Sequence, residues 1–323
     1  MPEQIVCVHR GQSGDDRLWY ATYDGSWTAD ILLGNDARSL DKPGVAAIDN
    51  LLYCVHRGEQ SDDRLWWTTF DPANAAWTAD QPLPNGARSS VGPGVATYLG
   101  QLFCVYKGAN DNALRWCSFD PVTQQWTNEQ QLPSADTYAP PTILMWNNIL
   151  WCVYRGAHDQ NLWCTTYFAS QWSSSVRFPH GNESGDGPAL VVGPNHLMCI
   201  HRGKHTQSVI GQLGGMLVPT EPNQAMWWSD FEGFDVATRG QWSADQHIYR
   251  NRSATSPAAV FYAGQVICVH RGETQQDPAG GARYDDHLYY MTYNGRLTWF
   301  QDIKFPQGNL SHAGVGLAVL DFP

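Results

Sequence analysis

Hydrophobic and polar positions along this chain fall into short runs, and each run ends at a cluster of turn-forming residues. The first run, Ile5–Val8, ends at His9–Gly11, and an Asp-rich turn separates it from the aromatic run Leu18–Tyr23. Short β-branched and aromatic runs bounded by Gly, Asp, Asn or Pro are typical of β-strands. The period of 3.6 residues that indicates a helix is not sustained along the chain. The pattern therefore predicts an all-β protein.

This pattern is repeated along the chain. Strings related to Cys-Val-His-Arg-Gly begin at Cys7, Cys54, Cys104, Cys152, Cys199 and Cys268. The first four intervals between them are about 47 to 50 residues, which is the length of a β-propeller blade rather than of a helical repeat. The last interval is longer by about twenty residues, which indicates an insertion.

Each repeat presents four short strands in the same order. A Cys-containing strand is followed by an Asp- or Asn-rich turn, a Leu-aromatic strand, a strand opened by Trp, and a small-residue strand such as Pro43–Ala46. Six such repeats predict a six-bladed β-propeller with four-stranded blades, which forms a single domain over residues 1–323. The repeats are expected at about 5–50, 51–100, 101–148, 149–195, 196–264 and 265–323.

The two ends of the chain supply complementary parts of one blade. The chain begins inside a repeat, at the strand Ile5–Arg10, and ends with a small-residue strand at Gly314–Val319. Pairing of these strands would complete a blade, close the ring and remove an exposed sheet edge. In this arrangement the small-residue strand is innermost and the Cys strand is second. The repeated Trp column that includes Trp27 is then expected in the core.

One face of the predicted ring carries most of the variable polar sequence. The loop after each Cys strand shares this face with the loop that enters each innermost strand. The insertions Lys204–Pro222 and Glu273–Tyr284 also lie here, and their Gly, Gln and Pro content predicts loops. Loops raised on a rigid scaffold are a common location for binding sites.

The candidate binding residues are polar and aromatic side chains that recur at this face. In a structural interpretation, the basic and acidic residues form salt bridges, and the His and Tyr residues form a column packed between blades. In a binding interpretation, the same side chains form hydrogen bonds to sugars and stack on sugar rings. The two interpretations are compatible. The residues are His9, Arg10, Asp16, Trp19, His56, Arg57, Asp63, Trp66, Tyr106, Lys107, Tyr154, Arg155, Trp163, His201, Arg202, Trp227, His270, Arg271, Asp286 and Tyr289.

Composition narrows the choice of partner. The formal net charge of −11 argues against nucleic acid and against anionic lipid, since both require a basic surface. The 15 Trp and 14 Tyr residues suit both a propeller core and stacking on sugars. Six of the eight cysteines occupy equivalent blade positions, too far apart to pair, so we expect buried thiols and a reducing compartment. No run approaches the ~18 apolar residues of a membrane span, and no secretory signal is visible. We expect a soluble protein that is cytoplasmic or released without a signal peptide.

The strand order and the corner Asp24–Trp27 resemble the six-bladed propeller lectins of fungi and bacteria, with Aleuria-type or tectonin-like architecture. The resemblance covers nearly the whole chain and implies a sugar-binding propeller. Aleuria-type lectins place an Arg early in the second strand and a Glu in the third, and these contact fucose. The corresponding places here hold apolar residues such as Leu52-Tyr53 and Trp66-Trp67, so no fucose site is carried over.

The leading hypothesis is a multivalent, non-catalytic lectin that binds glycans or glycoconjugates. A sialidase-like glycoside hydrolase with one asymmetric site near the long loops is an alternative, with Glu221, Glu232 or Glu273 as acids. The other alternative is a protein-binding scaffold. No nucleophile elbow, phosphate loop or zinc motif is present, and no cofactor is expected. The Asp15-Asp16 and Asp62-Asp63 turns are weak candidates for calcium, since EF-hand spacing is absent.

Overall fold

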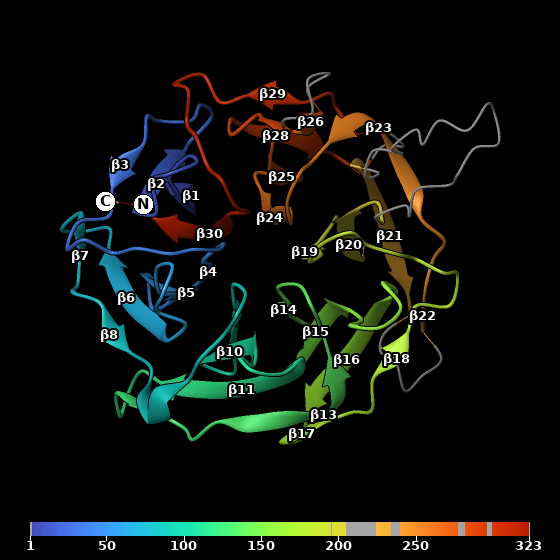
Figure 1. Ribbon diagram of the computed structural model, residues 1–323, viewed down its shortest axis with the longest axis horizontal. Coiled ribbons are helices and arrows are strands. Elements are labelled where there is room, and N and C mark those ends of the chain that lie inside the picture. Colours follow the sequence, from blue (N-terminus) through green and yellow to red (C-terminus); the bar gives the residue numbers. More distant parts are fainter. Residues whose placement is uncertain are drawn as a thin grey trace.

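The structure is a computed structural model that describes residues 2–194, 196–204, 224–233, 240–276, 282–295 and 299–322. Six antiparallel sheets surround a central axis, and Figure 1 shows them arranged as the blades of a ring. The predicted six-bladed β-propeller is confirmed. The described residues contain no helix long and apolar enough to cross a membrane.

Every blade has the same strand order from the axis outward. The innermost strands are β30 (Gly316–Asp321), β4 (Gly44–Ile48), β9 (Gly94–Tyr98), β14 (Thr142–Trp146), β19 (Ala189–Val192) and β24 (Ala258–Tyr262). The second strands are β1 (Glu3–Arg10), β5 (Leu51–Arg57), β10 (Gln101–Lys107), β15 (Ile149–Arg155), β20 (Leu197–Arg202) and β25 (Gln265–Arg271). The third strands are β2 (Leu18–Tyr23), β6 (Leu65–Asp71), β11 (Ala113–Asp120), β16 (Leu162–Phe168), β21 (Ala225–Glu232) and β28 (Leu288–Tyr293).

Short outer strands complete the blades. They are β3 (Ile31–Leu32), β7 (Ala76–Trp77), β8 (Gln81–Pro82), β12 (Gln125–Trp126), β13 (Gln130–Asp136), β17 (Gln171–Trp172), β18 (Val176–Arg177), β22 (Gln241–Trp242), β23 (Gln246–Arg252) and β29 (Ile303–Lys304). In four blades the outer edge is divided between two such strands, both paired with the third strand. The 3₁₀ turn η1 (Pro84–Gly86) lies between β8 and β9.

The ring closes as the two chain ends predicted. Strand β30 pairs antiparallel with β1, with Ile5 opposite Val319 and Val8 opposite Gly316. These strands share one blade although they lie at opposite ends of the chain (Figure 1). Because β1 is covered on both edges, by β2 and β30, the first strand of the chain is not left as an open sheet edge.

The apolar core lies between neighbouring blades, which explains why the second strands are almost continuously hydrophobic. In β1, Val6 and Val8 pack toward the next blade, while Ile5 and Cys7 pack toward the preceding one. A strand buried on both faces needs apolar residues at every position rather than at alternate ones. The Trp27 ring, 2% exposed, stacks on the neighbouring blade and belongs to this core.

The sixth-repeat insertion differs from its prediction. The sequence predicted a loop over Glu273–Tyr284, whereas β26 (Thr274–Gln276) and β27 (Ala282–Tyr284) form a two-stranded hairpin. The strand sequences Thr-Gln-Gln and Ala-Arg-Tyr show no apolar alternation, so hydrophobic periodicity gave no sign of the hairpin. In the fifth-repeat insertion, residues 205–222 lie outside the described residues, and Glu221 with them.

Candidate functional site

The loops that enter the innermost strands are held by a repeated buried hydroxyl. Each hydroxyl donates to the carbonyl oxygen two residues further on, over 2.5–2.9 Å. This feature was not predicted. The sequence does contain a signal for it, since a Ser or Thr stands five residues before the first residue of each innermost strand. The residues are Ser39, Ser89, Thr137, Ser184, Ser253 and Ser311.

The repeated basic residues bind backbone oxygens of the same loops. Arg10 Nη1 donates to the Leu40 carbonyl at 2.9 Å, and Arg57 Nη1 donates to the Ser90 carbonyl at 3.1 Å. The expected salt bridge to the turn acids is therefore replaced here by bonds to main-chain acceptors, which fix the loop leading to the next blade. Arg155 and Arg202 donate to loop carbonyls in the same way, whereas Lys107 donates to the Ser90 hydroxyl and to carbonyl oxygens of its own turn. Arg155 is half-buried, and the other five basic residues of the set are buried.

In four of the six turns, the first acid accepts a hydrogen bond from the aromatic side chain near the start of the third strand. Asp62 Oδ2 accepts the Trp66 indole N–H at 3.0 Å and also pairs with Arg64, whose guanidinium lies 4.6 Å from the Trp66 ring centre. These hydrogen bonds, of which the one from Arg64 has the largest effect, lower the pKa of Asp62 to about 2. The same acid-to-aromatic bond recurs at Trp19, Trp163 and Tyr289.

The second acids of the first two turns, Asp16 and Asp63, have other partners, and so does the aromatic residue Trp227. Asp16 pairs with Arg38 at 2.6 Å, and Asp63 pairs with Arg88. Trp227 contacts the His247 ring at 4.7 Å between ring centres. The aromatic residues predicted on the third strands are half-buried and lie in five different blades, so they do not form one site. They are Trp19, Trp66, Trp163, Trp227 and Tyr289.

The predicted His and Tyr column is buried. His9, His201 and His270 each place Nε2 within 2.9–3.0 Å of an acid: Asp30, Asp245 and Asp302. His56 lies 3.2 Å from Asp80, and Tyr106 donates to Glu129. Tyr154 is 2% exposed, and none of the other five is more exposed than that. These side chains serve blade packing here, and their contact with a ligand stays a prediction.

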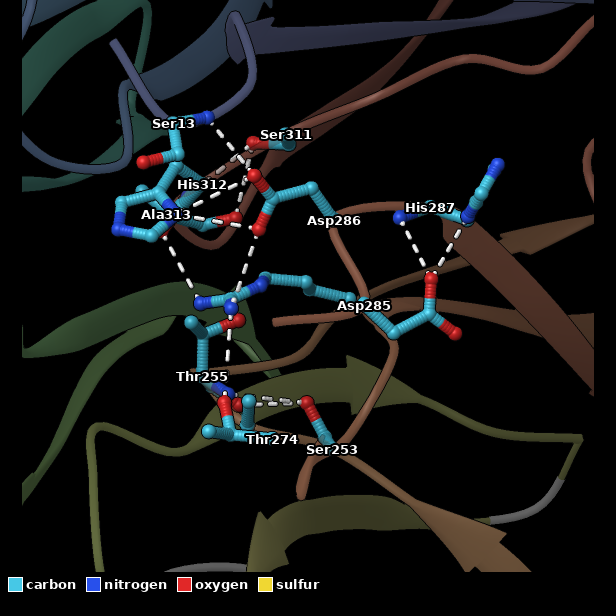
Figure 2. A network of polar contacts seen from close by, with 12 residues as sticks. Ser13, Ser253, Thr255, Thr274, Asp285, Asp286, His287, Ser311, His312 and Ala313 are labelled. Carbon is cyan, nitrogen blue, oxygen red and sulfur yellow. Dashed lines mark hydrogen bonds and ion pairs between the residues drawn. The ribbon is translucent and has the colours of Figure 1, made fainter. Parts of the chain in front are cut away.

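A polar pocket of about 470 Å³ opens where the sixth blade meets the first. Asp286 organises it: the carboxylate accepts the backbone N–H of Ser13 at 2.7 Å and contacts His312 Nδ1 at 3.1 Å (Figure 2). Asp286 also forms an ion pair with Arg271 at 3.1 Å. This one side chain therefore ties together both blades and the loop between them. The pocket is lined by Gln12, Glu273, Tyr284, Asp285, Asp286, His287 and Leu310.

The pocket combines an exposed aromatic ring with carboxylate acceptors. The Tyr284 ring is 55% exposed and lies 5.5 Å from the Arg271 guanidinium. Burial raises the pKa of Asp285, but hydrogen bonds from His287 and Tyr289 outweigh burial and leave that pKa below its ordinary value. The carboxylate is thus charged at neutral pH and can accept ligand hydroxyl groups. Such a pairing of ring and acceptors suits a sugar, which has an apolar C–H face and a polar edge.

Only part of this pocket was predicted from the sequence. Arg271 and Asp286 were predicted, and the structure brings them together. Tyr284, His287 and His312 were missed, because they do not recur in the other repeats. The position of Tyr284 at the end of a repeat-specific insertion was the available signal.

The two described acids considered for a hydrolase, Glu232 and Glu273, are not brought together. Glu273 follows the second strand of its blade and pairs with Arg252 at 2.9 Å. Both lie on the loop-bearing face, which is the face of the ring where the second strands end. Glu232 ends β21, which starts at that face, so Glu232 lies at the opposite face of the ring.

The calcium candidates also have protein partners. Asp15 pairs with Arg17, and Asp16, Asp62 and Asp63 pair with arginines as described above. Among the described residues no group of three or more His, Cys, Asp or Glu side chains is placed to hold a metal ion.

Comparison with known proteins places this fold beside sugar-binding propellers. No family model and no curated sequence matches the chain. AofleA from Arthrobotrys oligospora superposes with a TM-score of 0.59 at 12% identity, over 99% of this chain and 93% of that one. A mutant of Aleuria aurantia lectin in complex with Fucα1-6GlcNAc gives a TM-score of 0.61 at 12% identity, covering 96% and 94%. SapL1 lectin in complex with α-methyl fucoside gives 0.56 at 12%, covering 95% and 97%.

The chain thus has the fold of six-bladed propellers that include fungal lectins, and the predicted architectural resemblance is confirmed. At 11–12% identity this similarity defines the fold and leaves the ligand to be argued from the chain's own residues.

Proposed function

We propose that this protein is a non-catalytic, carbohydrate-binding lectin whose principal site is the pocket between the sixth and first blades. The observation that carries the proposal is the exposed Tyr284 ring beside the carboxylates of Glu273, Asp285 and Asp286. Structural neighbours crystallised with fucosides support a glycan as the class of ligand.

The pocket chemistry indicates how a sugar would be held. The C–H face of a pyranose would pack on Tyr284, while adjacent hydroxyls donate to Asp285 and Asp286. Stacking of this kind contributes roughly 0.5–1.5 kcal/mol, and charge-assisted hydrogen bonds are stronger than neutral ones. Three carboxylates in the lining disfavour sialylated or sulfated ligands, so we expect a neutral or amino sugar.

Further, weaker sites are proposed at the Trp19 and Trp66 units. Both rings are half-buried, with Arg17 and Arg64 close to them. Several weak sites on one rigid ring would gain avidity on a glycan-coated surface, which supports the multivalent form of the proposal.

The decisive experiment compares two tyrosine variants by glycan array and calorimetry. Tyr284→Ala removes the exposed ring from the pocket, and we expect glycan affinity at this site to fall by roughly two- to twelvefold, the factor that corresponds to about 0.5–1.5 kcal/mol. Tyr138→Ala is the matched control, since Tyr138 is 52% exposed on a loop of another blade junction, and affinity should be unchanged.

Two outcomes contradict the proposal. One is a folded protein that binds no glycan on a broad array. The other is a bound glycan whose affinity is equal for the native chain and the Tyr284→Ala variant, which would remove the principal site from this pocket.

A further inference from the structure

The axis of the ring is an apolar channel with a volume of about 430 Å³. Its wall is formed by the six innermost strands and the residues just before them. Nearly every lining residue is Gly, Pro or a hydrocarbon side chain, and the polar side chains are Thr97, Thr142 and Lys42. Lys42 is the single charged residue of the lining.

Small residues at the equivalent positions leave room for this lysine. The residues that correspond to Lys42 in the other blades are Gly92, Pro140, Gly187, Ser256 and Gly314. A Cβ atom at Gly92 would lie 2.8 Å from Lys42 Cγ, and one at Gly314 would lie 3.3 Å from Lys42 Cδ. A side chain at Gly92 would therefore collide with the lysine. The lysine stem occupies the loop-bearing end of the axis.

The Lys42 side chain is buried and has no direct counter-ion among the described residues. Lys42 is 7% exposed, and among the described residues Nζ has no hydrogen bond and no carboxylate within 4.0 Å. Burial lowers the pKa of Lys42, and the more distant Asp186 and Asp41 oppose that effect. A buried cation without a partner is costly, so an anion that reaches Nζ from the channel would be favoured.

The two nearby acids are already bound by backbone groups. Asp41 accepts the N–H of Lys42 at 2.7 Å and that of Gly92 at 2.8 Å. Asp186 accepts the N–H of Gly187 at 2.8 Å and that of Ser256 at 3.0 Å. These bonds join neighbouring blades and hold both carboxylates away from Nζ.

The opposite end of the channel is apolar and accessible. Met145 and Phe261, near the ends of β14 and β24, both line the channel and are 43% and 41% exposed. Large hydrophobic side chains at a mouth favour entry of an apolar group. A sugar is not favoured here, because the wall offers few polar partners for its hydroxyls.

We propose that the axial channel binds an aliphatic carboxylate, with its head group on Lys42 Nζ and its unbranched tail along the innermost strands toward Met145 and Phe261. One cation at one end of an apolar channel matches one anionic head and one hydrocarbon tail. This site is separate from the pocket at the blade junction, so it does not depend on the proposed lectin function.

The test is calorimetric titration of the native protein with sodium octanoate and sodium decanoate below their micellar concentrations. We expect saturable binding of one molecule per chain, tighter by about fourfold for each added methylene. Decanol and decyltrimethylammonium have the same tail with a neutral or a cationic head, and both should bind at least tenfold more weakly than decanoate.

Substitution of the lysine tests the contact itself. Lys42→Met keeps an unbranched side chain and removes the buried charge, so we expect a folded protein with decanoate affinity reduced at least tenfold. Lys304→Met is the matched control, because Lys304 is exposed on β29, and it should bind decanoate as the native chain does. Glycan binding should be the same in all three proteins.

The proposal is overturned if decanoate does not bind, or if the three head groups bind the native protein equally well. Equal decanoate affinity in a folded Lys42→Met variant overturns it too. Should that variant not fold, the head-group comparison on the native chain decides alone. Loss of decanoate binding with intact glycan binding distinguishes this site from the junction pocket.

Discussion

At the scale of single residues, buried polar groups in this ring are repeatedly paired with a specific partner. His270 illustrates the balance: burial by itself would lower its pKa, but Asp302 at 2.9 Å outweighs burial and raises it. A His with a raised pKa contributes stability below the pKa of the unfolded chain, and that contribution is lost as pH rises through the folded pKa.

A test of this pair is the variant Asp302→Asn. Without the carboxylate, burial should move the His270 pKa below its ordinary value of about 6.5. The loss of thermal stability should therefore be larger at pH values below the ordinary His pKa of about 6.5, and it should shrink at alkaline pH. Unfolding scans across pH measure this, with Asp24→Asn as a control, since Asp24 is exposed. A loss that is the same at every pH would contradict the assigned balance.

At the scale of elements, the innermost strand of the first blade comes from the other end of the chain. Pairing of β30 with β1 gives the first blade its fourth strand, and Ala318 and Leu320 join the core shared with the second blade. Without β30, the backbone groups of β1 would form an exposed edge beside an apolar surface.

A chain truncated after Ala313 should therefore fail to form a stable monomer. We expect aggregation or loss of the cooperative thermal transition, measured by light scattering and circular dichroism. A synthetic peptide of residues 310–323 should restore the transition by adding the missing strand. The same peptide with Ala318→Pro should not, because proline lacks the N–H that the ladder uses. A stable truncated monomer would show that closure by β30 is dispensable.

At the scale of the whole molecule, the ring buries every cysteine. All eight thiols are buried and none forms a disulfide. Burial raises the pKa of the Cys7, Cys54 and Cys268 thiols, so the reactive thiolate is suppressed as well as shielded. Reactivity of these thiols therefore reports on opening of the ring.

Thiol labelling with an aromatic disulfide reagent makes this quantitative. We expect no rapid labelling of the native protein and eight labelled thiols per chain in concentrated guanidinium. Partial, rapid labelling of the native protein would mean that a blade opens on its own. Labelling rates that follow global unfolding would indicate that the ring opens as one cooperative unit.

The fold was largely predictable from the sequence because each blade is encoded by the same local pattern of strands and turns. The number of blades is predicted by six Cys strands with their turns and aromatic strands. Ring closure is predicted because Ile5–Arg10 and Gly314–Val319 are complementary parts of one repeat. The hairpin formed by β26 and β27 was not predicted, because its short strands carry no apolar alternation.

The candidate sites were less predictable, because repetition marks scaffold as well as function. His9 and Arg10 recur for packing and loop fixation, whereas Tyr284 occurs once and lies in the pocket. The number of blades, the strand order and the closure follow from local periodicity and turn chemistry, so the amino-acid sequence specifies them directly. That Asp286 joins the first and last blades, and that Lys42 is the charged side chain among the described residues lining the axial channel, became visible in the folded ring. Both depend on distances between repeats, which arise only when the ring closes.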